Sequence, residues 1–77
     1  MKRLIQGLES ANKIELLLSA TSIRSEKTIE ALKRHYVLGY SIELLVSGMG
    51  IDESNFRRAD SILNNMADLV IKISEAD

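Results

Sequence analysis

The chain contains no cysteine, no proline and no tryptophan, and its aromatic residues are two tyrosines and one phenylalanine. Without cysteine it can form neither a disulfide nor a thiolate metal site, and it has no thiol nucleophile. The absence of proline, the abundance of Leu, Ile, Ala, Glu and Lys, and the lack of alternating β-branched runs together favour an all-helical fold. The single histidine has no visible partner cluster, so we expect no metal site.

Long apolar runs are also missing. No stretch approaches the roughly 18 apolar residues of a membrane span. The first residues, Met1-Lys2-Arg3, are not followed by the apolar run and small-residue cleavage site of a secretory signal peptide. We therefore expect a cytoplasmic protein with no membrane partner.

The chain is short, at 77 residues. A domain of this size buries only roughly 60–65% of the surface that its unfolded chain exposes, so its stability is marginal and oligomerisation is a common support. There is no phosphate-binding loop and no pair of carboxylates in a glycine-rich context, and the chain is too short for a substantial cleft. The sequence thus predicts a protein that is not an enzyme and has no cofactor or small-molecule ligand.

Neither sign of charge dominates, since the chain has ten Lys and Arg residues and eleven Asp and Glu residues, for a net charge of −1. Nucleic-acid-binding domains are typically basic, so the total argues against DNA. The distribution is uneven, however. Residues 24–35 hold four basic and two acidic side chains, whereas residues 68–77 hold three acidic and one basic. The acidity therefore lies partly in the tail.

Capping residues predict four helices in a single domain that spans residues 10–77. A side-chain oxygen at the residue before a helix accepts one of its unpaired amides, and four residues are placed to do so: Ser10, Ser25, Ser41 and Asp52. The first helix should end near Thr21 or Ser22, the second at Gly39 and the third at Gly48-Met49-Gly50. Residues 1–9 form an N-terminal segment of uncertain structure, because Gly7 weakens any extension of the first helix.

The centre of the chain has the spacing of a helix-turn-helix. Val46 is the modest side chain where two helices cross, and Gly50 accepts the positive φ of the turn. The second helix is then pinned by Ile51, Phe56 and Ala59. In the third helix we expect Leu44 and Leu45 to face inward.

Polar residues at the start of the fourth helix are candidate DNA contacts. Ser and Asn can hydrogen-bond bases or phosphates, and Arg is the most common donor to both; the residues concerned are Ser54, Asn55, Arg57 and Arg58. Lys33 and Arg34, with His35 beside them, are candidates for clamping a phosphate. Each of these is also a plausible solvated side chain, and Tyr36 and Tyr40 are expected to pack rather than to stack on bases.

The fourth helix carries two apolar stripes. One stripe recurs at spacings of three and four over about five turns and comprises Phe56, Ala59, Leu63, Met66, Val70 and Ile73. The second comprises Ile62, Met66, Leu69 and Ile73. A small domain needs only one such face, so we expect the second stripe to form a homodimer or higher homo-oligomer.

Over roughly residues 10–74 the chain resembles the PapB family of adhesin (fimbrial) biosynthesis transcription regulators from enteric bacteria. The resemblance rests on Leu17-Leu18, Ser22-Ile23-x-Ser25 followed by Glu26-Lys27, Ile29-x-Ala31-x-Lys33, Val37-x-Gly39-x-Ser41 and Phe56. It implies an all-helical bacterial DNA-binding protein that controls pilus or adhesin operons by binding AT-rich double-stranded DNA as an oligomer. It also implies a role for Lys33 in phosphate contact or charge pairing.

Two hypotheses of function follow. The first is a nucleoid-associated transcription regulator that binds DNA directly. The second is a helical interaction module that dimerises or binds another regulator, with weak or no DNA binding. The second is favoured by the net acidity, by the second apolar stripe and by Ile42-Glu43, which stand where members of the family tend to be basic.

Overall fold

The computed structural model describes residues 4–76, so residues 1–3 of the predicted N-terminal segment and residue 77 lie outside the described residues. Within that range the chain is helical and contains no strand, as the composition predicts. The elements, in chain order, are α1 (Ala11–Ser19), α2 (Glu26–Lys33), the π-helical turn η1 (Arg34–Leu38), α3 (Ile42–Met49) and α4 (Glu53–Glu75). The long C-terminal helix is confirmed.

Each α-helix begins after the capping residue that the sequence predicts. The hydroxyls of Ser10, Ser25 and Ser41 and the carboxylate of Asp52 each accept a backbone N–H three residues along. Gly39 and Gly50 follow η1 and α3 with φ of 85° and 68°, the left-handed conformation that glycine adopts at little cost. The first helix ends at Ser19, slightly before the predicted Thr21 or Ser22.

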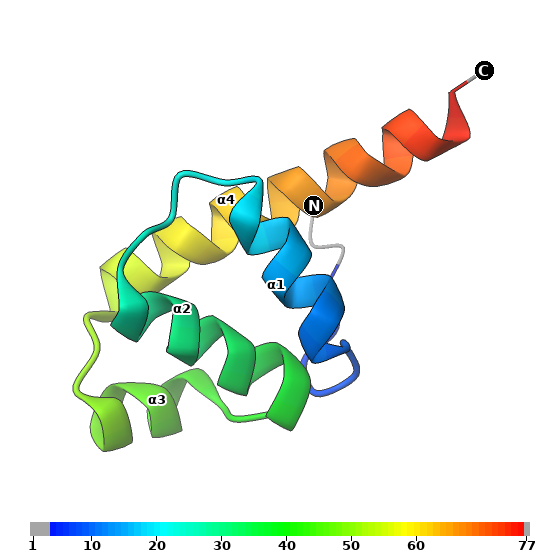
Figure 1. The fold of residues 1–77 in the computed structure, drawn as a ribbon. Helices are drawn as coiled ribbons and strands as arrows, with labels where there is room; N and C mark the ends of the chain where they lie inside the picture. The colour runs from blue at the N-terminus through cyan, green and yellow to red at the C-terminus, as the bar shows by residue number, and fades with distance from the viewer. Residues whose placement is uncertain (1–3, 77) are drawn as a thin grey trace.

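Helix α2 lies at the centre of the molecule, between α1, α3 and α4 (Figure 1). The core is formed where these helices meet, and its largest fully buried side chains come from every element: Ile14, Leu32, Tyr36, Leu45, Phe56 and Leu63. The main contacts of α3 and of α4 are made with α2. The turn that joins them is nevertheless tight, since it spans only residues 50–52 between the two helices. The helix-turn-helix is thus held together largely through the helix before it.

Residues 4–9 are not helical; they form a turn that is hydrogen-bonded to η1. The N–H of Gly7 donates to the carbonyl of His35 at 3.2 Å, and that of Glu9 donates to Tyr36 at 3.0 Å. Gly7 approaches Gly39 so closely that a Cβ on Gly7 would lie 3.1 Å from the Gly39 Cα. The glycine that weakens a helix here permits a close backbone contact instead.

Two predictions about exposure are wrong, and the apolar seam of α4 is buried over only part of its length. Leu44 does not face inward with Leu45; it is 50% exposed, whereas Leu45 is fully buried. His35 is not available to a phosphate, because the π-helical turn directs its ring into the core, where it is 4% exposed. The predicted seam of α4 is buried only as far as Leu63, and its last members, Val70 and Ile73, are exposed because the C-terminal half of α4 projects beyond the other helices (Figure 1).

Candidate nucleic-acid interface

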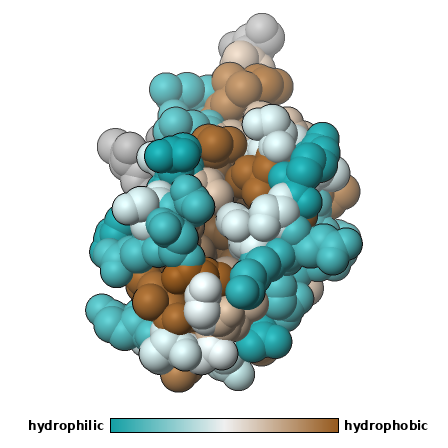
Figure 2. Space-filling model, turned by 90° about the vertical axis from the view of Figure 1, so that its left-hand side faces the viewer, coloured by the Kyte–Doolittle hydropathy of each residue, from teal (hydrophilic) through white to brown (hydrophobic). Residues whose placement is uncertain are grey.

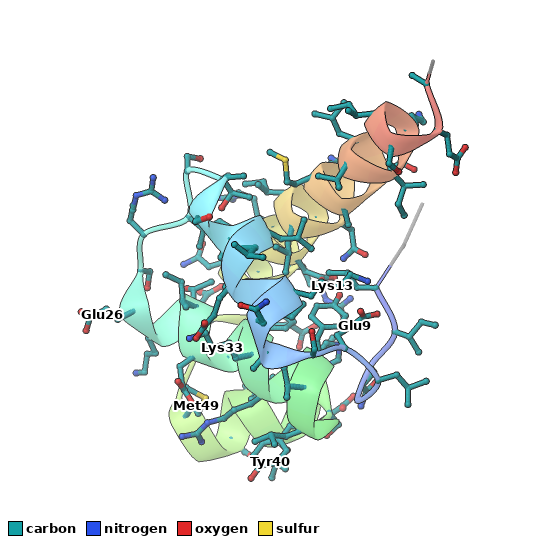
Figure 3. All side chains as sticks on the ribbon, turned by 45° about the vertical axis from the view of Figure 1, so that its right-hand side comes forward. Glu9, Lys13, Glu26, Lys33, Tyr40 and Met49 are labelled. Carbon is teal, nitrogen blue, oxygen red and sulfur yellow. The ribbon has the colours of Figure 1, made fainter. Side chains whose placement is uncertain are left out.

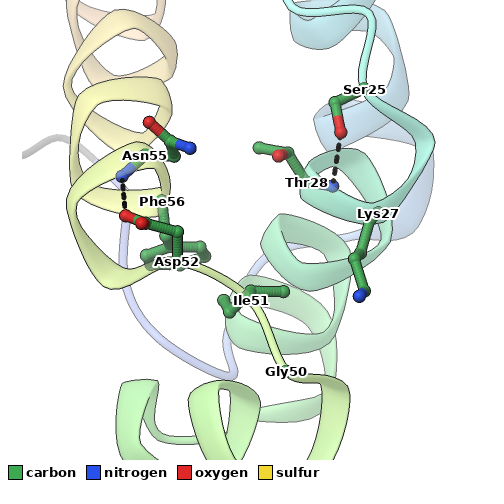
Figure 4. A pocket seen from close by; sticks show the side chains of 8 residues that line it. All are labelled: Ser25, Lys27, Thr28, Gly50, Ile51, Asp52, Asn55 and Phe56. Carbon is green, nitrogen blue, oxygen red and sulfur yellow. Dashed lines mark hydrogen bonds between the residues drawn. The ribbon is translucent and has the colours of Figure 1, made fainter.

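Helices α2 and α4 begin on the same side of the molecule, facing each other across a hollow of about 160 Å³ (Figure 4). Ser25 caps α2 on one side, and Asp52 caps α4 on the other, accepting the Asn55 N–H at 3.0 Å. Lys27 and the side chain of Asn55 line the same hollow. Helix N-termini carry positive partial charge and unpaired amides, an arrangement that favours phosphate groups.

A second hollow, of about 300 Å³, continues from the first and shares Ser25, Thr28 and Asn55 with it. Its rim carries Arg24 from the loop before α2 and Arg58 from α4. Figure 2 views the molecule from this side, where hydrophilic side chains surround smaller hydrophobic patches. The starts of α2 and α4, together with the loop that precedes α2, therefore form a face with exposed polar and positively charged side chains.

Of the residues predicted from the sequence, four lie on the first two turns of α4, and all four are exposed. Asn55 lines both hollows, and Arg58 lines the second. The guanidinium of Arg57 donates to Glu53 at 2.8 Å in an exposed pair. Such an exposed pair contributes little to stability, so Arg57 can exchange Glu53 for a phosphate at small cost.

Lys33 and Arg34 lie at the other end of α2, about 12 Å from Ser25 at the helical rise per residue. Glu26 and Lys33 mark the two ends of this helix in Figure 3. Lys33 donates to Glu15 of α1 at 2.9 Å, and Arg34 donates to Glu30 at 3.0 Å. The structure thus does not bring these two residues together with Asn55 and Arg58.

Arg24 and Lys27 were not singled out as contacts in the sequence, although both belong to the positively charged stretch of residues 24–35. Arg24 closes its loop by donating to the carbonyls of Thr21 and Ile23, at 2.8 and 2.9 Å. Lys27 forms no ion pair with any residue from 4 to 76. The excess of basic residues in this stretch was the only sequence feature that pointed to them. The fold shows that they lie beside Asn55 and Arg58.

A buried polar cluster stands apart from this face and joins η1 to α4. The hydroxyl of Tyr36 donates to the Asp60 carboxylate, and the Asn64 amide donates to the Tyr36 oxygen at 2.9 Å. Asn64 also accepts the Leu4 N–H at 3.1 Å, which ties the N-terminal segment to α4. Burial, together with the hydrogen bond to Asp60, raises the pKa of Tyr36 well above its usual value. The hydroxyl therefore stays neutral and acts as a structural donor.

Glu9 and Lys13 form a second electrostatic link at the N-terminal segment (Figure 3). Burial acts to raise the pKa of Glu9, but the hydrogen bonds from Lys13 and from the Ile5 N–H, both 2.7 Å, and the charge of Lys13 lower it below its ordinary value. The carboxylate remains ionised and fixes the turn against α1.

The predicted oligomerisation residues lie along one line of α4. Ile62, Leu69 and Ile73 are exposed by 38%, 49% and 64%, and Met66 between them is half-buried.

The search for membrane-spanning helices finds none in residues 4–76, since no helix there combines the length and the apolar character that a span requires. The same residues contain no group of three or more side chains suited to holding a metal ion.

Comparison with known proteins gives a structural match. No family model matches the chain, and no curated protein sequence does. The crystal structure of E. coli FocB is similar to it, with a TM-score of 0.86 and 25% sequence identity over 92% of this chain and 81% of that chain. FocB is a regulator of a fimbrial operon. The architecture is thus shared with a fimbrial regulator, in agreement with the resemblance to the PapB family.

Proposed function

We propose that this chain is a DNA-binding transcriptional regulator of an adhesin or fimbrial operon. It acts as an oligomer in the bacterial cytoplasm, associated with the nucleoid, and its helix-turn-helix places residues 53–58 against AT-rich DNA. The observation that carries the proposal is the fold shared with FocB over 92% of the chain. The polar face at the starts of α2 and α4 supports it independently.

The contacts follow from the chemistry of that face. Asn55 and Arg58 project from the first turns of α4, where an amide can pair with an adenine edge and a guanidinium with a guanine edge or a phosphate. Lys27 and the two helix N-termini add positive potential beside them. Ser54 and Arg57 extend the contact along the exposed side of α4.

Lys33 and Arg34 remain proposed phosphate contacts at the far end of α2. Both must exchange an existing carboxylate partner for the phosphate. Their net contribution to affinity is therefore smaller than that of Lys27 or Arg58.

Fluorescence anisotropy with labelled AT-rich and GC-rich promoter duplexes, at several salt concentrations, tests the proposal. We expect tighter binding to the AT-rich duplexes. The slope of log K against log salt should be modest, about −4 to −5 for each bound copy, because each of the five proposed cationic contacts displaces about one counterion; these contacts are Lys27, Lys33, Arg34, Arg57 and Arg58. Absence of binding to any duplex at about 50 mM salt would contradict the proposal.

Single substitutions then test the face. Asn55→Ala and Arg58→Ala should each weaken binding to the AT-rich duplex about tenfold, the loss expected for one base or charged phosphate contact. Lys13→Ala is the matched control, since it removes one positive charge from α1, away from this face. Lys33→Ala and Arg34→Ala should each weaken binding by less than Arg58→Ala and by more than Lys13→Ala. Equal losses for Arg58→Ala and Lys13→Ala would mean that only total charge matters.

The second function, a helical interaction module, is favoured by one observation: α4 exposes an apolar stripe that none of residues 4–76 covers. The double substitution Arg57→Ala and Arg58→Ala separates the two functions in a reporter assay of the regulated operon. A module would keep its regulatory effect, whereas a direct DNA binder would lose it.

A further inference from the structure

Three positive side chains on the polar face have no carboxylate partner among residues 4–76. That range contains eight Lys and Arg residues, and five of them form ion pairs: Lys13, Lys33, Arg34, Arg57 and Lys72. The other three are Arg24, Lys27 and Arg58, and each of them lines one of the two hollows between α2 and α4. The cations that can accept a new anion without giving one up are therefore gathered in one place.

The loop before α2 holds Arg24 in a fixed position. Its guanidinium donates through Nη1 to the carbonyls of Thr21 and Ile23, at 2.8 and 2.9 Å. The hydroxyl of Thr21, which is buried, donates to the Leu18 carbonyl at 2.8 Å and accepts the Ile23 N–H at 3.2 Å. An arginine that is ordered before binding loses less conformational entropy when it meets a ligand.

The rest of the Arg24 guanidinium remains available to a ligand. A guanidinium has five N–H groups, and in Arg24 only those of Nη1 donate to residues from 4 to 76. The Nε–H and Nη2–H groups form the planar fork that can bind two oxygens of one phosphate. Arg24 is thus a preorganised anion donor at the rim of the 300 Å³ hollow.

Arg58 borders the same hollow from α4. Two guanidinium charges beside one hollow repel each other, and an anion between them replaces that repulsion by attraction. Thr28 of α2 and Asn55 of α4 point toward each other between the two helix starts (Figure 4), and both line the hollow. Its other lining side chains are the polar Ser22 and Ser25 and the apolar Ile23, Ala59 and Ile62. Polar groups for a phosphate and apolar groups for a deoxyribose therefore lie side by side.

We propose that Arg24 and Arg58 hold one phosphate of the DNA backbone between them in this hollow. Arg24 is then a DNA contact from outside the helix-turn-helix, and Lys27, at the first hollow, contacts a separate phosphate. The inference rests on the proposed function and adds to it a residue that positions α4 on the duplex. Because the salt slope counts the phosphates that are neutralised, Arg24 raises the affinity without steepening that slope.

Paired substitutions test whether the two arginines share a phosphate. Arg24→Ala and Arg58→Ala should each weaken binding to the AT-rich duplex about tenfold. The double variant should lose only about 20–30-fold, because either substitution already loosens the phosphate that the other arginine holds. Arg58→Ala combined with Lys27→Ala is the matched control, and its losses should multiply to about a hundredfold. A hundredfold loss for the Arg24 and Arg58 pair would show two independent contacts and overturn the proposal.

A purely structural role of Arg24 needs a separate measurement, because this residue also closes its loop. Nuclear magnetic resonance can follow the Arg24 Nε–H signal of the unmodified chain, assigned by its absence from Arg24→Lys. We expect the signal to shift when the chain is saturated with the AT-rich duplex. An unshifted signal in a chain that binds the duplex would overturn the proposal, while the proposed function would stand.

The same signal distinguishes the DNA backbone from a free phosphate. A shift with the duplex supports the proposal, whether or not millimolar inorganic phosphate also shifts the signal. A shift with inorganic phosphate in a chain that binds no duplex would assign the hollow to a small phosphorylated ligand and overturn the DNA contact. If the chain binds no duplex and neither addition shifts the signal, the proposal and the proposed function both fail.

Discussion

At the scale of single residues, the side chains that hold this small core together include polar ones. Tyr36 is among the largest fully buried side chains, and its hydroxyl connects Asp60 and Asn64 of α4 to the end of the central helix. A buried polar cluster is stabilising when every member finds a partner and costly when one is removed. This cluster therefore fixes how α4 packs against η1.

Tyr36→Phe should destabilise the fold by about 1–3 kcal/mol, because it removes the hydroxyl that Asp60 accepts from while keeping the ring. Thermal or urea unfolding measures the loss, and Tyr40→Phe is the matched control, since Tyr40 is only partly buried. Equal stability of the two variants would show that the hydroxyl of Tyr36 has no structural role.

The same residue predicts a pH dependence. The pKa of Tyr36 is raised in the folded chain, so its contribution to stability is fully present below the unfolded value near 10 and is lost as the pH rises above it. The unfolding free energy should fall with a slope of up to about 1.4 kcal/mol per pH unit in that range. Tyr36→Phe should remove this part of the slope, and an unchanged slope in the variant would contradict the assignment.

Residue identity did not determine the environment of each side chain. His35, Lys33 and Arg34 are consecutive charged or polar residues, and together they suggest a phosphate clamp. The π-helical turn sends His35 inward, where its Nδ1–H donates to the Tyr40 carbonyl at 2.7 Å and its ring meets Phe56 at 5.7 Å. Which of three neighbours is buried depends on the turn geometry, and a charge count carries no information about that geometry.

At the scale of elements, helix starts and stops were well predicted because the signals act over three or four residues. A serine or aspartate at the cap bonds an amide within its own helix, and a left-handed glycine ends a helix by its own φ. No distant contact is needed for either effect. The predicted starts at Ser10, Ser25, Ser41 and Asp52 are all confirmed for this reason.

Gly39→Ala should destabilise the chain by about 1–2 kcal/mol, since a side chain disfavours the left-handed backbone. The added Cβ would lie 3.5 Å from Gly7, an ordinary contact, so the cost is conformational. Gly48→Ala is the control: it lies within α3, its Cβ would meet nothing within 4 Å, and it should be neutral or stabilising. Thermal unfolding of both variants measures the difference, and equal midpoints would contradict it.

The direction in which an element presents its side chains was predicted less well. Leu44 and Leu45 are neighbours in a short apolar helix, and α3 buries only one of them because its main contact is with one helix, α2. The apolar seam of α4 is regular to its end, but the body of the molecule covers only part of it. Periodicity predicts that a stripe exists; the length of the neighbouring helices decides how much of it is buried.

At the scale of the whole molecule, a 77-residue chain without disulfides has a thin core, and α4 extends past it with exposed apolar side chains. Covering that surface with a second copy would add burial that the single chain lacks. Folding and association would then be coupled, because a partner that binds only the folded state stabilises it by mass action.

The thermal midpoint should therefore rise with protein concentration, by roughly 5–10 °C for a hundredfold increase when the unfolding enthalpy is that of a dimer of this size. Scanning calorimetry over that concentration range measures the shift. Leu69→Glu should show a lower midpoint that does not depend on concentration. A midpoint of the unmodified chain that is independent of concentration would indicate that the exposed stripe does not contribute to stability.

The sequence by itself determined the helical class, the four helix starts, the left-handed glycines and the central helix-turn-helix spacing, because these depend on composition and on contacts within one or two turns. The tertiary structure alone decided which positive charges share a face. Arg24 and Lys27 lie with Asn55 and Arg58, although about thirty residues separate them, while Lys33 and Arg34 face away into ion pairs with Glu15 and Glu30. That grouping follows from the packing of α4 against the start of α2, a long-range contact that no local pattern encodes.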